Sequence, residues 1–164
     1  MEVLGVDIGG VIIQRTGDVG EDDTSFWGPN YLETPEVEDA ITTIAALSRD
    51  RFGDAVYLVS KCGEDTEARS REWLSHNQFF ERTGVAPANV YFCRKREEKA
   101  PICTRLGMTH FVDDRLEVLS YLVDVPHRYL FQPRDQEVAE FSQFLSAVER
   151  VDSWKAVQAV ITGP

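Results

Sequence analysis

The stretch GVDIGGVII, residues 5–13, decides the fold that we expect for this chain. The apolar residues at its start predict a buried strand over 2–8. This strand carries one carboxylate, that of Asp7, into a turn opened by Gly9 and Gly10. An aspartate in this place either caps the turn or serves an active site, and what lies at the other strand ends distinguishes the two roles.

Short apolar runs alternate with helical patterns along the rest of the chain. The expected strands span 2–8, 55–59, 89–92, 109–112 and 127–131. Helices are expected from Thr34-Pro35 to Gly53, from Asp65-Thr66 to Gly84, over 100–106, after Asp114, over 138–148 and over 152–161. Strands separated by helices imply parallel βαβ units with right-handed crossovers. We therefore expect a single α/β domain over 1–164, with a doubly wound, Rossmann-like parallel sheet and its site at the carboxyl ends of the strands.

The segment 14–33 interrupts this alternation, because it is polar, rich in glycine and longer than most loops. It starts at the strand end that carries Asp7, so we expect it to form a loop or flap over the site. Its aromatic residues Phe26, Trp27 and Tyr31 either stack on a substrate or hold the loop on the core. The segment is too short for a large cap domain, and we expect a small cap or none.

Composition and charge exclude several classes of function. The 164 residues carry a net charge of −11, which argues against general binding to nucleic acid. The chain has no apolar stretch of membrane-spanning length and no pattern of a signal peptide, so we expect no membrane association. Its three cysteines, at 62, 93 and 103, match no zinc spacing and suggest reduced thiols in a cytoplasmic protein.

Polar side chains stand where three of the expected strands end. The first strand leads to Asp7, the second to Ser60 and the fourth to the pair Asp113 and Asp114. Lys99 lies 14 residues ahead of Asp113, at the start of a helix. Three carboxylates brought together favour a bound cation such as Mg²⁺, and a lysine with a hydroxyl group suits a phosphoryl group. A carboxylate beside them can attack phosphorus to form an aspartyl-phosphate.

Further groups near these strand ends are candidates for contacts with phosphate. They are Lys61, which directly follows Ser60, and the backbone N–H groups of Gly9 and Gly10. Lys95 lies four residues before Lys99 and is an alternative for the functional lysine.

In this order, the residues resemble the motifs of the haloacid dehalogenase (HAD) superfamily, most of whose members are Mg²⁺-dependent phosphatases. The motifs are VDIGGVI (6–12), LVSKCG (58–63), EEKAPIC (97–103) and HFVDDR (110–115). The resemblance implies that Asp7 is the nucleophile and that Ser60 binds the phosphoryl group. It further implies that Lys99 balances charge, while Asp113 and Asp114 hold Mg²⁺.

One position departs from the family pattern. The first motif usually reads D-x-D, and its second aspartate protonates the leaving group and later activates water, but here that position is Gly9. The family uses the backbone carbonyl of this residue as a metal ligand, so Gly9 can still complete a Mg²⁺ site with Asp7 and Asp113. The general acid/base is missing, and such a group is typically worth about 10²–10⁴-fold in rate.

The missing acid leaves three explanations open. In the first explanation, a carboxyl group of the 14–33 segment supplies the proton, and the candidates are Asp18, Glu21, Asp22 and Asp23. Alternatively, the substrate needs no acid, or the site binds a phosphorylated ligand without turning it over.

The leading hypothesis is Mg²⁺-dependent hydrolysis of a small-molecule or macromolecular phosphate ester through Asp7. The alternative is a catalytically impaired HAD-like protein that binds a phosphorylated ligand or a protein partner.

Overall fold

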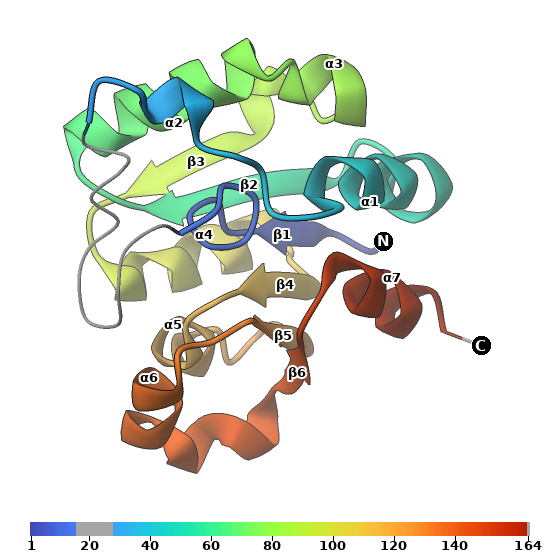
Figure 1. Ribbon diagram of the computed structural model, residues 1–164. Coiled ribbons are helices and arrows are strands. Elements are labelled where there is room, and N and C mark those ends of the chain that lie inside the picture. The colour runs from blue at the N-terminus through green and yellow to red at the C-terminus, as the bar shows by residue number, and fades with distance from the viewer. Residues whose placement is uncertain (16–27, 164) are drawn as a thin grey trace.

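Six parallel strands form one sheet, in the order β3-β2-β1-β4-β5-β6, in the computed structural model, which describes residues 1–15 and 28–163 (Figure 1). The strands are β1 (Leu4–Val6), β2 (Val56–Lys61), β3 (Val90–Cys93), β4 (His110–Asp113), β5 (His127–Phe131) and β6 (Glu149–Val151). The strand order reverses at β1, whose neighbours are β2 and β4. The expected doubly wound α/β fold is confirmed.

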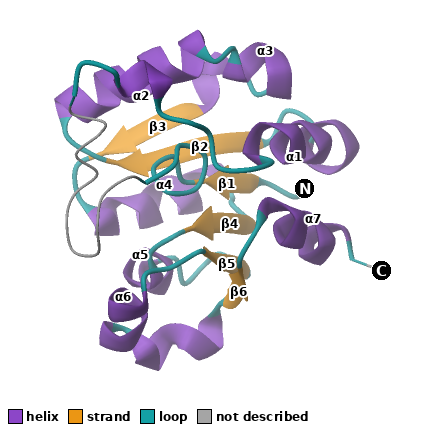
Figure 2. Cartoon of the chain, viewed as in Figure 1, coloured by secondary structure: helices purple, strands orange, loops and turns teal. Residues whose placement is uncertain are grey.

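Helices cover both faces of the sheet (Figure 2). They are α1 (Ala40–Leu47), α2 (Glu64–His76), α3 (Phe79–Thr83), α4 (Lys99–Leu106), α5 (Leu116–Tyr121), α6 (Asp135–Glu140) and α7 (Trp154–Thr162). The helices α1, α2, α3 and α7 share one apolar core with one face of the sheet, and α4, α5 and α6 share a second core with the other face. The sheet is thus apolar on both sides, as expected for parallel strands.

Two buried tryptophans fix the chain around the end of β1. The indole N–H of Trp154 donates to the backbone carbonyl of Val11 at 2.8 Å, and that of Trp73 donates to the carbonyl of Thr34 at 2.8 Å. Both side chains are fully buried. The turn after Asp7 is therefore held by α7, and α2 holds the segment at Thr34, whose neighbour Pro35 accepts the N–H of Gln14.

The first helix begins later than the Thr34-Pro35 signal predicts. Glu36 forms an antiparallel bridge with Ile13, and the N–H of Gln14 donates to the carbonyl of Pro35 at 3.0 Å. The Glu36 carboxylate also accepts the N–H of Ile41. Long-range pairing keeps this segment extended, and α1 starts only at Ala40.

Two other helix predictions were only partly right. The pattern over 65–84 is divided into α2 and α3 at Gln78, whose φ of 53° is left-handed. The pattern over 138–148 gives the short α6, a 3₁₀ segment Ser142–Ala147 and then β6, which was not predicted. Of the apolar residues of that pattern, Val138, Phe141, Phe144 and Val148 pack against the second core, whereas Leu145 is exposed.

Most of the 14–33 segment lies outside the described residues. This includes the acid candidates Asp18, Glu21, Asp22 and Asp23 and the aromatic residues Phe26 and Trp27, so the predicted loop or flap stays a prediction. Within the described part, the Tyr31 hydroxyl donates to the Glu72 carboxylate on α2, and the Tyr31 side chain packs against the first core. Of the helices in the described ranges, none is long and apolar enough to cross a bilayer.

Candidate active site

Three buried carboxylates meet where β1 and β4 end. Asp7 directly follows β1, Asp113 ends β4, and Asp114 comes next in the chain. The N–H of Asp7 donates to the carbonyl of Val112 at 3.0 Å, which joins the two strand ends. One carboxylate oxygen from each aspartate lies within 4.8 Å of the others. The strand ends converge as the sequence predicts.

Lys99 joins two of these carboxylates. Its Nζ donates to Asp7 Oδ1 at 3.0 Å and to Asp113 Oδ2 at 2.8 Å, and its side chain is only 2% exposed. Burial alone would lower the pKa of Lys99, but the charges of Asp113 and Asp7 outweigh it and raise the pKa above its usual value. Lys99 is therefore a fixed cation. The alternative residue, Lys95, is exposed.

The carboxylates of Asp7, Asp113 and Asp114, called the acidic group here, are difficult to keep ionised together. Burial, and then the charge of Asp7, raise the pKa of Asp113 to about 6 against the opposing effect of Lys99. The pKa of Asp114 is also well above its usual value, because of burial and the charges of Asp7 and Asp113. With all groups ionised, the three carboxylates form ion pairs with Lys99 and Arg15 and also feel the charge of Arg115, and the pKa values of Asp113 and Asp114 are raised even so. Such an environment favours an additional cation.

Arg15 is a member of this site that the sequence did not reveal. Its Nη1 lies 3.2 Å from Asp114 Oδ2, and its Nη2 donates to the carbonyl of Gln132 at 2.6 Å. Arg15 thereby ties the Asp114 carboxylate to the end of β5. The residue stands in the polar stretch after the glycine turn, where no local pattern indicates such a contact.

The two glycines of the turn differ in what they require. Gly10 has a φ of +79°, and a Cβ built on it would lie 2.5 Å from Asp114 Oδ2. Only glycine fits there without a shift of the acidic group. Gly9, in contrast, is exposed, has no left-handed φ, and a Cβ built on it would meet no atom of the described residues within 4 Å. Nothing in the described backbone demands glycine at position 9.

The residues expected to contact phosphate lie on the neighbouring strand. Ser60 is buried near the end of β2, which pairs with β1, and Lys61 is the exposed last residue of that strand. Lys61 has no ion-pair partner in the part of the chain that the structure describes. Burial raises the pKa of the nearby Cys62 thiol to about 11, so this thiol is protonated at neutral pH.

The buried position of Lys99 leads to a prediction on stability. Replacing Lys99 with Met removes both ion pairs and leaves buried carboxylates without their cation. We expect the free energy of unfolding to fall by about 3–5 kcal/mol in metal-free buffer, as measured by urea denaturation.

The matched control is Lys95→Met, which removes an exposed lysine four residues away and should change the free energy of unfolding by no more than about 0.5 kcal/mol. Adding Asp113→Asn to Lys99→Met removes one unpaired carboxylate and should restore part of the loss. Equal stabilities of Lys99→Met and Lys95→Met would contradict the prediction.

Comparison with known proteins supports the fold. No protein-family model and no curated protein sequence matches the chain. Among solved structures, the chain is similar to a HAD family hydrolase from Deinococcus radiodurans R1, a crystal structure with bound phosphate and sodium. The TM-score is 0.66 at 11% sequence identity, over 98% of this chain and 95% of that one. The chain therefore has a HAD-like fold.

Proposed function

We propose that this protein is a metal-dependent hydrolase of the HAD type, acting on a phosphate ester through an aspartyl-phosphate on Asp7. The observation that carries the proposal is the position of Lys99, buried between Asp7 and Asp113, with Asp114 beside them. A buried lysine placed among three carboxylates is costly to a fold, and such clusters are found at functional sites. The likeness to a HAD family hydrolase with bound phosphate supports the same reading.

The residues of the site suit the steps of such a reaction. A carboxylate oxygen of Asp7 attacks phosphorus, so that an O–P bond to Asp7 forms as the O–P bond to the leaving group breaks. Water then cleaves the aspartyl-phosphate and releases phosphate. The Lys99 ammonium offsets negative charge at Asp7 and at the phosphoryl group, and we assign this role to Lys99 rather than to the exposed Lys95.

Ser60 and the groups around the turn would bind the phosphoryl oxygens. The Ser60 hydroxyl and the backbone N–H of Gly9 are neutral donors, and Lys61 is an exposed cation at the same strand end. The N–H of Gly10, which the sequence also offered for this role, already donates to the carbonyl of Ile13 at 2.8 Å. These contacts would orient the phosphorus atom toward Asp7.

The donor set fits a hard divalent cation. Asp7, Asp113 and Asp114 offer carboxylate oxygens within 4.8 Å of one another, and burial raises the pKa of both Asp113 and Asp114. We propose that these residues, with the backbone carbonyl of Gly9, hold Mg²⁺. When bound, the ion would supply positive charge opposite the phosphoryl oxygens.

The glycine at position 9 leaves two kinds of protein to be distinguished. Position 9 has no carboxyl group, so the acid that the D-x-D pattern would supply for a poor leaving group is missing from this position. Two kinds of protein are consistent with this: a hydrolase whose substrate leaves readily, and a silenced relative that binds a phosphorylated ligand or protein partner. Turnover of an activated ester by the parent chain would separate them.

The remaining expectations stay part of the proposal. The substrate is a small-molecule or macromolecular phosphate ester, and general nucleic-acid binding is not expected at a net charge of −11. The cytoplasm is proposed as the location because all three cysteines are free thiols.

The first experiment measures hydrolysis of p-nitrophenyl phosphate by the parent chain with Mg²⁺ and after chelation with EDTA. Its leaving group is a stable anion, so the absence of an acid at Gly9 matters least for this substrate. We expect turnover that falls on the order of 10²-fold or more with EDTA and returns when Mg²⁺ is added in excess. A rate unaffected by EDTA would contradict metal dependence, and no turnover at all would favour the binding protein.

A further inference from the structure

Arg15 bridges the ends of two neighbouring strands beside the acidic group. Its Nη1 lies 3.2 Å from Asp114 Oδ2, just beyond β4, and its Nη2 donates to the carbonyl of Gln132, just beyond β5, at 2.6 Å. The Asp114 side chain is only 7% exposed, and that of Arg15 is 24% exposed. This ion pair is therefore largely shielded from water, unlike pairs on a protein surface.

The backbone at Gln132 has an unusual conformation, and its carbonyl is the second acceptor for Arg15. Its φ is 39°, in the left-handed region that residues other than glycine seldom adopt. Two further hydrogen bonds fix the residue: its N–H donates to the carbonyl of Val151 at 3.1 Å, and its side-chain amide donates to the carbonyl of Asp152 at 3.0 Å. Such strain persists only where the surrounding structure determines it. The acceptor for Arg15 is thus fixed by β6 and the residue after it.

The glycine turn after β1 makes room for the same ion pair. A Cβ built on Gly10 would lie 2.5 Å from Asp114 Oδ2 and 3.1 Å from Cδ of Arg15. The aliphatic part of Arg15 therefore packs against this turn. Three segments, namely the turn and the ends of β4 and β5, together place one guanidinium group against one buried carboxylate.

The cations of the site divide the acidic group between them. Lys99 contacts the other two carboxylates, whereas Arg15 is the ion-pair partner of Asp114 among the described residues. Arg115 adds positive charge near Asp114, but it forms no ion pair with this carboxylate in the described part of the chain. Asp114 thus depends on Arg15 for a direct contact with a cation.

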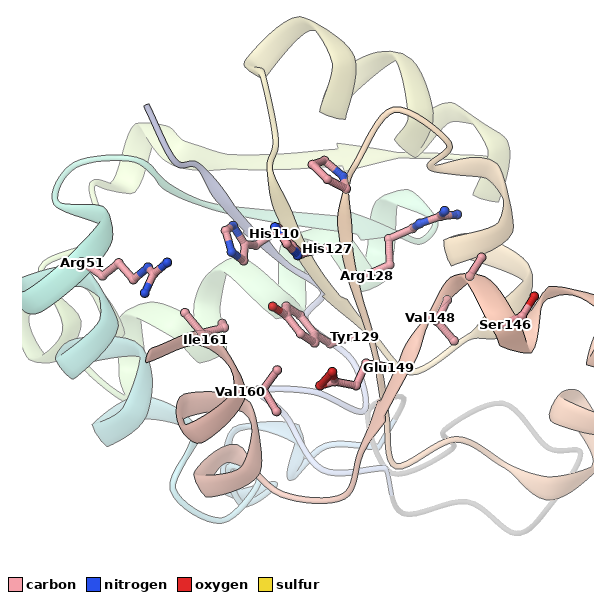
Figure 3. A pocket seen from close by; sticks show the side chains of 12 residues that line it. Arg51, His110, His127, Arg128, Tyr129, Ser146, Val148, Glu149, Val160 and Ile161 are labelled. Atoms are coloured by element: carbon pink, nitrogen blue, oxygen red, sulfur yellow. The ribbon is translucent and has the colours of Figure 1, made fainter. Parts of the chain in front are cut away.

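The arginines at the other end of the sheet are engaged elsewhere. Arg51 and Arg128 line a cavity of about 480 Å³ at the amino ends of β4 and β5, whereas Asp114 follows the carboxyl end of β4 (Figure 3). Arg51 pairs with Glu2 at 2.9 Å, and Arg128 donates to the carbonyl of Leu119 at 3.0 Å. Neither of them can therefore replace Arg15 at Asp114.

We propose that Arg15 competes with the divalent cation for Asp114 and thereby sets the affinity of the acidic group for metal. This inference rests on the proposed function, in which Asp114 takes part in holding Mg²⁺. In the metal-free chain, Arg15 supplies the positive charge that the buried carboxylate needs. A divalent ion held by Asp114 is repelled by the same guanidinium group. Arg15 therefore stabilises the metal-free site, and loading the site takes more free Mg²⁺ than the carboxylates alone would require.

The test measures Mg²⁺ binding by isothermal titration calorimetry, with the full chain freed of metal and without substrate. Mildly alkaline buffer is used, because protons then compete least with the ion for the carboxylates. Arg15→Gln should bind Mg²⁺ at least about fivefold more tightly than the parent chain, because one repelling charge is gone. Arg15→Lys retains the charge and should bind Mg²⁺ more weakly than Arg15→Gln. The matched control Arg49→Gln also removes one positive charge, but from an exposed arginine that pairs with Asp50, and should leave the affinity within a factor of about two.

The stability of the metal-free chain is a second readout. In EDTA, Arg15→Gln should unfold at a lower urea midpoint than the parent chain, because the Asp114 carboxylate has lost its partner. Saturating Mg²⁺ should raise the midpoint of this variant more than that of the parent. If the variant is unfolded in EDTA, Mg²⁺ should restore its far-UV circular dichroism, and a failure to do so would overturn the proposal.

The outcomes separate this inference from the proposed function. Mg²⁺ binding by both chains with equal affinity overturns the inference alone, as does binding by Arg15→Lys that is as tight as binding by Arg15→Gln. Weaker binding by a folded Arg15→Gln also overturns it, and would show that Arg15 positions Asp114 for the metal instead. If neither the parent nor Arg15→Gln binds Mg²⁺, the metal site of the proposed function fails together with the inference.

Discussion

The Asp7→Asn variant is expected to lose turnover of p-nitrophenyl phosphate by at least about 10³-fold relative to the parent chain. The amide is nearly isosteric with the carboxylate, but it is neutral and a poor nucleophile toward phosphorus. It also removes one carboxylate from the set available to a metal ion. Initial rates under saturating Mg²⁺ measure the loss, because they separate weaker metal binding from the lost nucleophile.

The fold should survive this substitution. Lys99 keeps its contact with Asp113 at 2.8 Å, and the backbone N–H of residue 7 keeps its bond to Val112. The matched control is Asp54→Asn, which changes an exposed aspartate just before the amino end of β2 and should leave the rate within a factor of about two. Substantial turnover by a folded Asp7→Asn variant would show that another group attacks phosphorus.

The placement of the candidate site could be predicted because it follows from strong local signals. The runs that end at Asp7 and Asp113 are short, apolar and bounded by turns, so their strands are evident. In a parallel sheet the carboxyl ends of such strands meet at one edge. The sequence could not decide between Lys95 and Lys99, which lie four residues apart. The structure does so, because Lys99 is buried and pairs with both carboxylates.

Other features depend on contacts between distant segments and left no local pattern. Arg15 contacts Asp114 and also the carbonyl of Gln132, which lies 117 residues later in the chain. The strand β6 has only three residues, too few for a periodic signal, and it is stabilised by pairing with β5. The late start of α1 results from the bridge between Ile13 and Glu36. Each of these outcomes is decided by tertiary structure over local preference.

Adding the missing carboxylate tests what Gly9 means for catalysis. We expect Gly9→Asp to raise kcat/KM for an alkyl phosphate such as glycerol 2-phosphate by about 10²–10⁴-fold, because an alkoxide leaving group needs a proton. With p-nitrophenyl phosphate, whose leaving group is already stable, the gain should stay below about tenfold. The structure permits the change: position 9 is exposed, its backbone is not left-handed, and a Cβ there meets no described atom within 4 Å.

The control for this gain is Gly9→Asn, which has the same size as Gly9→Asp but neither donates a proton to the leaving group nor accepts one from water. It should resemble the parent chain with both substrates, so that any difference between Asp and Asn reports on acid catalysis. A large gain by Gly9→Asp over an inactive parent would identify the natural protein as a silenced relative with an otherwise intact site. If the alkyl ester is instead hydrolysed equally by the parent and by both variants, the proton comes from another group, and the glycine at position 9 does not lower the rate.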